Sequence, residues 1–296
     1  MSVWERNRFH NDYGWVAHLI YIQVLPTMLK AMLKFWDPTY NCFTFGKFDL
    51  CPTIEEYQEI LNLGDSPKIY FHHANEIPRR QLDRSLNVKN SSIGHWQIPD
   101  SKNFSADAII KFYHETDDVE QKRSAFAILI YGLIIFPTAP GVINERVGMF
   151  VRSLKGGVHP VTAILAETIR SLSSSQSLGF LRPQYSPAYN NSKGYPLEFI
   201  MQEWPERSPL KKVWVRFFTN LSEENIEWLC PRKNNQKIIH ACGEFPWIPL
   251  AGIWGITAYV PNMFRRQYGN MQFIPWTFGL SRMTVSYNDP NAGSIL

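Results

Sequence analysis

QKRSAFAILIYGLIIF, residues 121–136, carries the strongest helical signal in the chain. The second half of this segment is apolar on almost every side, which indicates a helix at the centre of a hydrophobic core. Its apolar run, Ala125–Phe136, is too short to cross a bilayer, which needs about 20 helical residues. Pro137 is predicted to end the helix, because proline cannot continue the backbone hydrogen bonding.

The segments on both sides of this helix also show helical patterns. Apolar spacing over Trp15–Trp36 predicts a helix with Pro26 in a first turn, ending before Pro38. Val142–Leu154 is predicted to be helical, and a proline at the first position starts a further helix over residues 160–172.

A short β-hairpin and a capped helix are predicted between these helical regions. Cys42–Phe45 and Phe48–Leu50 read as two strands joined by a turn at Gly46-Lys47. Thr53 then opens a helix through a capping box, in which its hydroxyl accepts from the Glu56 amide while the Glu56 carboxylate accepts from the Thr53 amide. Ile54, Tyr57, Ile60 and Leu61 are the predicted buried face of that helix.

Length and composition describe a globular protein of one or two domains, and the helical patterns predict a mainly α fold. The chain has 296 residues, of which 45% are hydrophobic and 19% charged, enough to bury a large core. Residues 69–103 lack periodicity and are predicted to be mostly loop. Residues 1–172 form the N-terminal helical part and residues 173–210 a Ser/Pro-rich linker or altered segment. Residues 211–296 form the C-terminal part of the same domain, irregular, rich in Pro and Trp, with short helices joined by proline turns.

Charge and cysteine usage favour an intracellular protein. A net charge of +4 is too mild to indicate a nucleic-acid binder unless the basic residues share one face. The N-terminus lacks the pattern of a secretory signal, and 4 widely spread cysteines are too few for a disulfide framework. Phe245–Phe264 is uncharged, but its prolines interrupt the helix that a membrane span would need.

No residue is assigned to catalysis, to a cofactor or to a metal ion. Phosphate-binding glycine loops and a G-x-S-x-G turn are missing from the sequence. Only His240 and Cys242 are spaced closely enough to suggest a pair of zinc ligands. The acidic pairs Glu55-Glu56, Asp117-Asp118 and Glu223-Glu224 are read as helix-capping or solvated charges. The prediction is a non-enzymatic protein, with metal-dependent phosphoryl transfer on scattered acids as an open alternative.

Basic doublets are the candidate nucleic-acid contacts. They are Arg79 with Arg80, Lys211 with Lys212, and Arg265 with Arg266. Cations neutralise phosphates and aromatic rings stack on bases, so the doublets could form a nucleic-acid surface together with exposed tyrosines and tryptophans. Because the doublets lie far apart in the sequence, separate solvated charges are the favoured reading.

Taken in order, these segments resemble a known family. The matching strings are FWDPTYNCFTFGKFDLCPTIEEYQEILNL at 35–63, AFAILIYGLIIFPTAPGVI at 125–143, FTNLSEENIEWLCP at 218–231 and CGEFPWIPLAGIWGITAYVPNMFRRQYGNMQFIP at 242–275. Together they resemble the plant mobile domain group, in particular its uncharacterised, retrotransposon-associated branch. The chain departs from the group's pattern at residues 178–208, which proline interrupts.

The resemblance rests on two motifs and implies a function. The first is the element at Thr44, Phe45, Thr53, Ile54, Glu55 and Glu56, and the second is the helix end at Leu129, Gly132, Leu133, Phe136 and Pro137. The group is predominantly helical and includes MAIN-like proteins linked to transposon silencing.

The resemblance thus implies a transposon-derived, helical protein-interaction module. We expect protein partners, no cofactor, no membrane association, and an intracellular location that the resemblance places in the nucleus, with a chromatin-related role. A direct nucleic-acid-binding protein of a retroelement and a non-functional relic are the alternatives.

Overall fold

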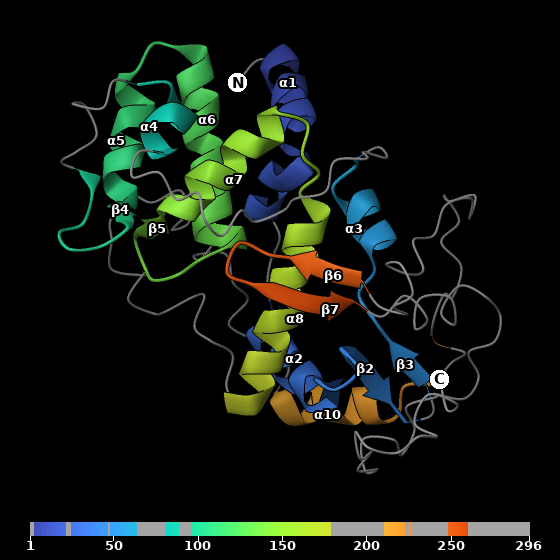
Figure 1. Cartoon of the computed structure of the whole chain (residues 1–296). Helices are drawn as coiled ribbons and strands as arrows, with labels where there is room; N and C mark the ends of the chain where they lie inside the picture. Colours follow the sequence, from blue (N-terminus) through green and yellow to red (C-terminus); the bar gives the residue numbers. More distant parts are fainter. Residues whose placement is uncertain are drawn as a thin grey trace, which may run out of the picture.

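The computed structural model describes residues 3–21, 25–46, 48–63, 81–88, 96–178, 210–222, 225 and 248–259. Within these ranges the protein is mainly α-helical and contains small antiparallel sheets, which confirms the predicted fold class. Helices gather around a large core at one end of the molecule, and a smaller unit lies at the other end (Figure 1).

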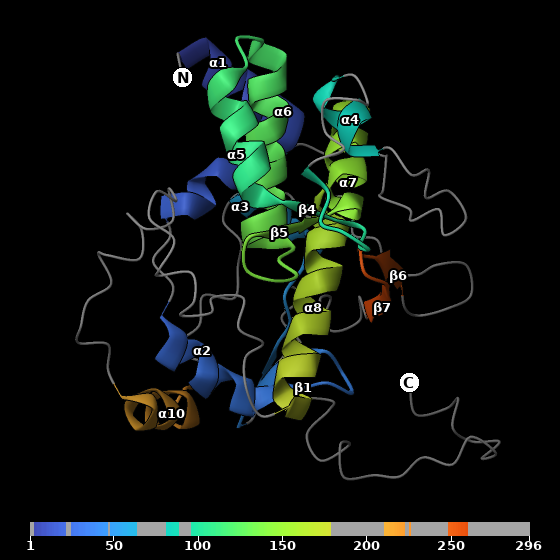
Figure 2. The same ribbon diagram turned by 90° about the vertical axis from the view of Figure 1, so that its left-hand side faces the viewer.

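The large core is surrounded by helices from the N-terminal half of the chain. These are α1 (Val3–Tyr13), η1 (Trp15–Tyr21), α4 (Gln81–Leu86), α5 (Ala106–Glu115), α6 (Val119–Ile130) and α7 (Glu145–Lys155). Helix α6 packs against α4, α5 and α7, so it lies at the centre of this bundle (Figures 1 and 2). The apolar segment Ala125–Phe136, predicted from its sequence to lie at the centre of the core, does lie there.

Helix α6 begins with a well-formed cap and ends in a wider turn. The Asp118 carboxylate accepts hydrogen bonds from the amides of Glu120 (2.8 Å) and Gln121 (3.1 Å). Tyr131–Ile135 then form a π-helical turn, η5, in which the Phe136 amide donates to the Tyr131 carbonyl at 2.7 Å. The helix predicted over residues 121–136 thus begins at Val119 and ends at Ile135, before Pro137 as expected, but its irregular last turn was not predicted.

Two short strands start the helices on either side of α6. Strands β4 (Asn103–Ser105) and β5 (Val142–Asn144) pair antiparallel, with Phe104 opposite Ile143. Asn144 caps α7 by accepting from the Arg146 amide at 3.1 Å. The helix predicted from Val142 therefore begins three residues later, because residues 142–144 pair with β4 instead.

Helix α8 (Val161–Leu178) extends from the large core toward the smaller unit (Figures 1 and 2). It follows Pro160 as predicted, but it runs through the serine-rich segment where residue 173 was expected to begin a linker. Ser173 accepts a hydrogen bond from the Trp36 indole at 3.1 Å, and Ser175 is buried. These serines continue the helix because they face neighbouring elements. Residues 179–209 of the predicted linker lie outside the described ranges.

The smaller unit combines residues 26–50 with a helix that lies far away in the sequence. It consists of α2 (Pro26–Met32), η2 (Leu33–Phe35), β1 (Trp36–Asp37), β2 (Cys42–Phe45), β3 (Phe48–Leu50) and α10 (Lys211–Thr219). Its core comprises the buried residues Ala31, Phe45, Phe48 and Phe218. The figures show α10 lying beside α2, in agreement with their contacts (Figures 1 and 2).

The predicted β-hairpin is present and has an additional strand. Phe45 pairs with Phe48 across the turn, where Gly46 adopts a φ of 61°, in the left-handed region that glycine favours. Trp36 pairs with Phe43 in the extra strand β1. The helix predicted to extend through Trp36 therefore ends earlier, at Met32, followed by a 3₁₀ turn.

The predicted capping box at Thr53 is confirmed. The Glu56 amide donates to Thr53 Oγ1 at 3.2 Å, while the Thr53 amide and hydroxyl donate to Glu56 Oε2 at 3.1 and 2.7 Å. Helix α3 (Ile54–Ile60) follows. Ile54 and Leu61 are buried as predicted, but Ile60 is exposed, because it lies about 100° around the helix axis from Leu61.

Replacing Thr53 by alanine is expected to lower the free energy of unfolding by about 1 kcal/mol, because the cap and its reciprocal bonds are lost. Urea denaturation measures this change. Thr39→Ala is the matched control, since Thr39 is exposed and its hydrogen bond to Asp37 uses the backbone amide, which alanine keeps. Equal stability of the two variants would contradict the capping role.

Helix α4 and a C-terminal pair of strands differ from what the sequence predicted. The predicted loop at residues 69–103 contains α4, whose Leu82 and Leu86 are fully buried and contact α7. The predicted short helices of the C-terminal part are replaced, where the structure describes this part beyond α10, by an antiparallel pair. Strands β6 (Ile248–Ala251) and β7 (Ile256–Tyr259) pack against α8. Among the described residues, no helix is both long enough and apolar enough to cross a membrane.

Candidate functional site

The predicted nucleic-acid contacts are only partly within the described residues. Lys211 and Lys212 lie at the start of α10 and are exposed. The other predicted doublets, Arg79-Arg80 and Arg265-Arg266, lie outside the described ranges. The structure therefore places one predicted doublet, Lys211-Lys212, on a defined surface at the start of α10.

The predicted motif residues contribute to packing and local structure. Thr44 donates to Asp49 at 2.8 Å across the hairpin, and Phe45 is buried in the smaller core. Gly132 faces Ile143, with no room for a larger side chain. Pro137 follows the end of the π-helical turn as predicted. Glu55 lies in α3. Thr44, Phe45 and Gly132 therefore have structural roles in the hairpin, the smaller core and the contact with Ile143.

The buried side of α10 attaches this helix to the smaller unit. The Phe218 ring lies 5.7 Å from the Phe45 ring and 5.8 Å from the Phe35 ring. Trp214 packs partly buried beside Phe218, with ring centroids 6.1 Å apart. One side of α10 is therefore held in an aromatic core.

A second apolar stripe on α10 faces solvent. Leu210, Val213 and Phe217 are 62%, 51% and 53% exposed. Val213 and Phe217 are one turn apart on one side of α10, and Leu210 is the residue that directly precedes the helix, three positions before Val213. We call Leu210, Val213 and Phe217 the α10 stripe. The apolar arc of α10 is wider than the smaller core can cover, so half of it is left at the surface.

Cations line one edge of the α10 stripe. Lys212 and Arg216 are exposed and lie one helical turn apart. On the helix surface they lie beside Val213. The exposed Lys30 and Lys34 lie on the neighbouring α2 and η2. Neither segment 25–36 nor segment 210–221 contains an acidic residue. The exposed part of α10 therefore combines an apolar stripe with positively charged side chains.

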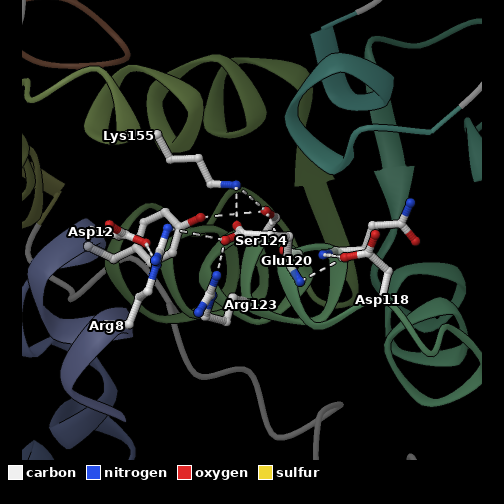
Figure 3. A network of polar contacts seen from close by, with 9 residues as sticks. Arg8, Asp12, Asp118, Glu120, Arg123, Ser124 and Lys155 are labelled. Carbon is white, nitrogen blue, oxygen red and sulfur yellow. Dashed lines mark hydrogen bonds and ion pairs between the residues drawn. The ribbon is translucent and has the colours of Figure 1, made fainter. Parts of the chain in front are cut away.

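A separate network of polar contacts connects α1, α6 and α7 around Glu120 (Figure 3). The Glu120 carboxylate contacts Arg8 at 3.6 Å, Lys155 at 3.3 Å and the Arg123 guanidinium. Asp12 lies 4.0 Å from Arg8. The pairs Arg8–Asp12 and Glu120–Arg123 are local, but Arg8 and Lys155 are far from Glu120 in the sequence, so no local pattern could have brought these three together.

Ser124 lies beneath this carboxylate. Lys155 donates to Ser124 Oγ at 2.8 Å, and the Ser124 hydroxyl donates to the Glu120 carbonyl at 2.8 Å. Some hydrolases use a serine and a lysine as nucleophile and base. Here the serine is 1% exposed and the lysine is the donor beside a carboxylate, so the pair links two helices instead.

Arg123 is the buried member of the network. Its side chain is 5% exposed, and its guanidinium contacts Glu120, whose side chain is 44% exposed. Neither Nε nor Nη1 of Arg123 donates a hydrogen bond within the structure. A buried guanidinium with unused donors is costly, because its hydration is lost without full replacement.

The turn between β6 and β7 is hydrogen-bonded to Glu167, a buried acidic residue of α8. Glu167 Oε1 accepts from the Trp254 amide at 2.8 Å, and Arg170 contacts the same carboxylate at 3.1 Å. Arg146 donates to the Ile253 carbonyl at 3.1 Å. A side chain at Gly252 would collide with the Glu167 carboxylate. The turn is therefore shaped to accept this carboxylate.

The chain matches one protein family over almost its whole length. The family described as Domain of unknown function (DUF7745) matches residues 1–295. The chain belongs to this family. The DUF7745 match includes the helical bundle, the smaller unit with α10 and the β6–β7 pair. No curated protein and no solved structure matches the chain.

In this DUF7745 chain the described residues contain no group of three or more His, Cys, Asp or Glu side chains placed to hold a metal ion. Cys42 and Cys51 are buried, and burial raises the pKa of the Cys51 thiol. His240 and Cys242, the spacing of which suggested a pair of zinc ligands, lie outside the described ranges.

The Glu167 carboxyl of this DUF7745 domain should make stability depend on pH. Burial raises its pKa, and the Trp254 hydrogen bond and Arg170 offset only part of that shift. The folded state then binds the proton more tightly than the unfolded state, so stability rises as pH falls through the folded pKa toward the ordinary value near 4.3. Within that window the slope is at most about 1.4 kcal/mol per pH unit for one proton.

Glu167→Gln should remove this contribution, which urea denaturation at several pH values between 4 and 8 measures. Glu115→Gln is the control, because Glu115 is exposed in α5 and pairs with the exposed Lys111. An unchanged pH profile in Glu167→Gln would show that the carboxyl does not titrate between the two states.

Proposed function

We propose that this DUF7745 domain is a non-enzymatic interaction module that binds a protein segment on the α10 stripe. The observation that carries the proposal is the exposure of Leu210, Val213 and Phe217 on a helix whose other side is already buried. Exposed apolar side chains aligned on one helix are typical of a surface that another protein covers.

The charge around the stripe selects the partner. Lys212 and Arg216 border the stripe, Lys30 and Lys34 lie on the neighbouring helix, and these segments have no carboxylate of their own. A partner helix with apolar residues at matching spacing and acidic residues beside them would bury the stripe and pair with the cations. We therefore propose an acidic amphipathic segment as the partner.

The alternative partner is a nucleic acid, which Lys211 and Lys212 could contact. The exposed side chains between the cations favour a protein, because leucine and valine offer nothing to a phosphate backbone and little to a base. Nucleic-acid binding is therefore the alternative that the binding experiment distinguishes from binding of a protein segment.

Fluorescence anisotropy with synthetic peptides tests the proposal. The probe is a helical peptide with leucines at three- and four-residue spacing and glutamates between them, and its scrambled version is the control. We expect saturable binding of the first peptide only. Phe217→Ser should weaken it roughly tenfold, since burying one such side chain contributes about 1.5–3 kcal/mol.

Two variants separate the sources of binding. Ile256→Ser removes another exposed apolar residue, far from α10 in the sequence, and should leave the affinity unchanged. Lys212→Gln with Arg216→Gln should weaken peptide binding and reduce its salt dependence. Equal binding of the scrambled peptide would overturn the proposal. Salt-sensitive binding of a DNA or RNA oligonucleotide without peptide binding would replace it with the nucleic-acid alternative.

The biological setting is part of the same proposal. The resemblance of residues 35–63 and 125–143 to the plant mobile domain group supports a transposon-derived protein that acts in the nucleus on chromatin-related partners. Mildly crosslinked co-purification from plant nuclei, comparing the original protein with Phe217→Ser, tests this setting. A chromatin protein lost specifically in the variant would support it, whereas identical recovery from both would contradict it.

A further inference from the structure

The polar network around Glu120 has more positive than negative charge at its centre. Arg8, Arg123 and Lys155 all contact one carboxylate, and Asp12 balances only Arg8, at a longer distance. The buried Arg123 keeps two nitrogen atoms, Nε and Nη1, without a hydrogen-bond acceptor. The cluster therefore has positive charge and donors beyond what its own carboxylate uses.

The carboxylate that occupies this centre can leave it. The Glu120 side chain is 44% exposed and lies in the first turn of α6, whose amides are already satisfied by Asp118. Rotation of the Glu120 side chain toward solvent breaks no backbone hydrogen bond and leaves the Asp118 cap intact. Arg123, by contrast, is enclosed by the bundle and stays in place.

We propose that Arg8, Arg123 and Lys155 form a binding site for a phosphate group, which Glu120 occupies in the unliganded protein. A tetrahedral phosphate offers more acceptor oxygens than a carboxylate and can accept from two guanidinium N–H groups at once. Its second negative charge would balance the remaining cations. Glu120 thus acts as an internal competitor that weakens binding, and the site lies on elements other than α10.

The contacts assign a role to each residue. Arg123 is the fixed floor of the site, and Arg8 and Lys155 are partly exposed side chains at its rim that approach from α1 and α7 (Figure 3). Lys155 is oriented by its hydrogen bond to Ser124 at 2.8 Å. Because the site joins three helices, an occupied site should also stabilise the bundle.

Calorimetric titration with inorganic phosphate at constant ionic strength tests this site, with thermal unfolding as a second readout. Glu120→Gln keeps the shape of the side chain and removes the competing charge, so we expect its phosphate affinity to be at least tenfold higher than that of the unmodified protein. Glu115→Gln, an exposed change on α5, is the charge-matched control and should bind like the unmodified protein.

Replacing the rim residues Arg8 and Lys155 tests the phosphate site without removing a buried side chain. Arg123 is buried, so its replacement could unfold the bundle, whereas Arg8→Gln and Lys155→Gln alter partly exposed side chains. In the Glu120→Gln background each should reduce phosphate affinity about tenfold or more. O-phosphoserine tests for a phosphate monoester: tighter binding than inorganic phosphate identifies a phosphorylated ligand, and exclusion of the monoester identifies the free ion. No saturable binding in Glu120→Gln, or a phosphate affinity in Glu115→Gln as high as in Glu120→Gln, would overturn the proposal.

Discussion

Phe150→Ala is expected to lower the free energy of unfolding by about 3–5 kcal/mol, the typical cost of removing a buried aromatic ring. Phe150 is fully buried in the large core. Its ring centroid lies 5.2 Å from those of both Tyr131 and Phe136, in edge-on arrangements. Removing it leaves a cavity between α7 and the end of α6 that side chains fixed on two helices cannot fill.

Tyr131 makes this cavity more costly. Its hydroxyl donates to the Tyr13 carbonyl at 2.8 Å, which fixes the ring and ties the end of α6 to α1. Burial also raises the pKa of Tyr131 well above its ordinary value, so the hydroxyl stays a donor at any pH that the fold tolerates.

Chemical denaturation of Phe150→Ala beside Phe217→Ala gives the measurement and its control. Phe217 is the same residue type but half-exposed on the α10 stripe, so its replacement should change stability by less than about 1 kcal/mol. Similar losses in both variants would mean that the large core is not centred on Phe150, or that the stripe is covered by part of the fold.

Gly132→Ala should destabilise the protein by about 1–3 kcal/mol through overpacking. A Cβ atom at Gly132 would lie 2.9 Å from both Cγ1 and Cγ2 of Ile143 on strand β5. Both atoms belong to a β-branched side chain that is itself fully buried, so neither can move aside easily. The π-helical turn must therefore shift away from β5.

A double-mutant cycle identifies the cause of that loss. Ile143→Ala removes the three atoms nearest to the new Cβ, so Gly132→Ala should cost little in that background. The expected coupling energy is about 0.5–3 kcal/mol. Leu250→Ala, a buried change on strand β6, serves as the control and should be additive with Gly132→Ala. Additive behaviour with Ile143→Ala would disprove the proposed collision.

Local signals in the sequence were sufficient to predict several elements. Thr53 and Glu56 form a capping box because both partners lie within four residues. The Phe45–Phe48 hairpin turn likewise depends on neighbouring residues alone. The predicted centre of the core was correct because an apolar run such as Ala125–Phe136 can be accommodated only in the interior.

The remaining features depend on contacts between distant residues. Trp36 leaves the predicted helix because it pairs with Phe43, and α8 continues past residue 172 because its serines meet other elements. The α10 stripe could have been suspected from apolar spacing at Leu210, Val213 and Phe217, but which side of the helix is covered depends on α2. The Arg8–Glu120–Lys155 cluster had no sequence signal, since its members come from three helices.

The pairing of α2 with α10 has a consequence for biosynthesis. Helix α2 and the β2–β3 hairpin leave the ribosome well over a hundred residues before α10, which covers them. At about 5–20 residues per second this delay is on the order of ten seconds. During that time Phe45, Phe48 and Ala31 lack part of their core, so the nascent chain exposes them to chaperones and to other chains. Synthesis that stops before residue 210 would make this exposure permanent.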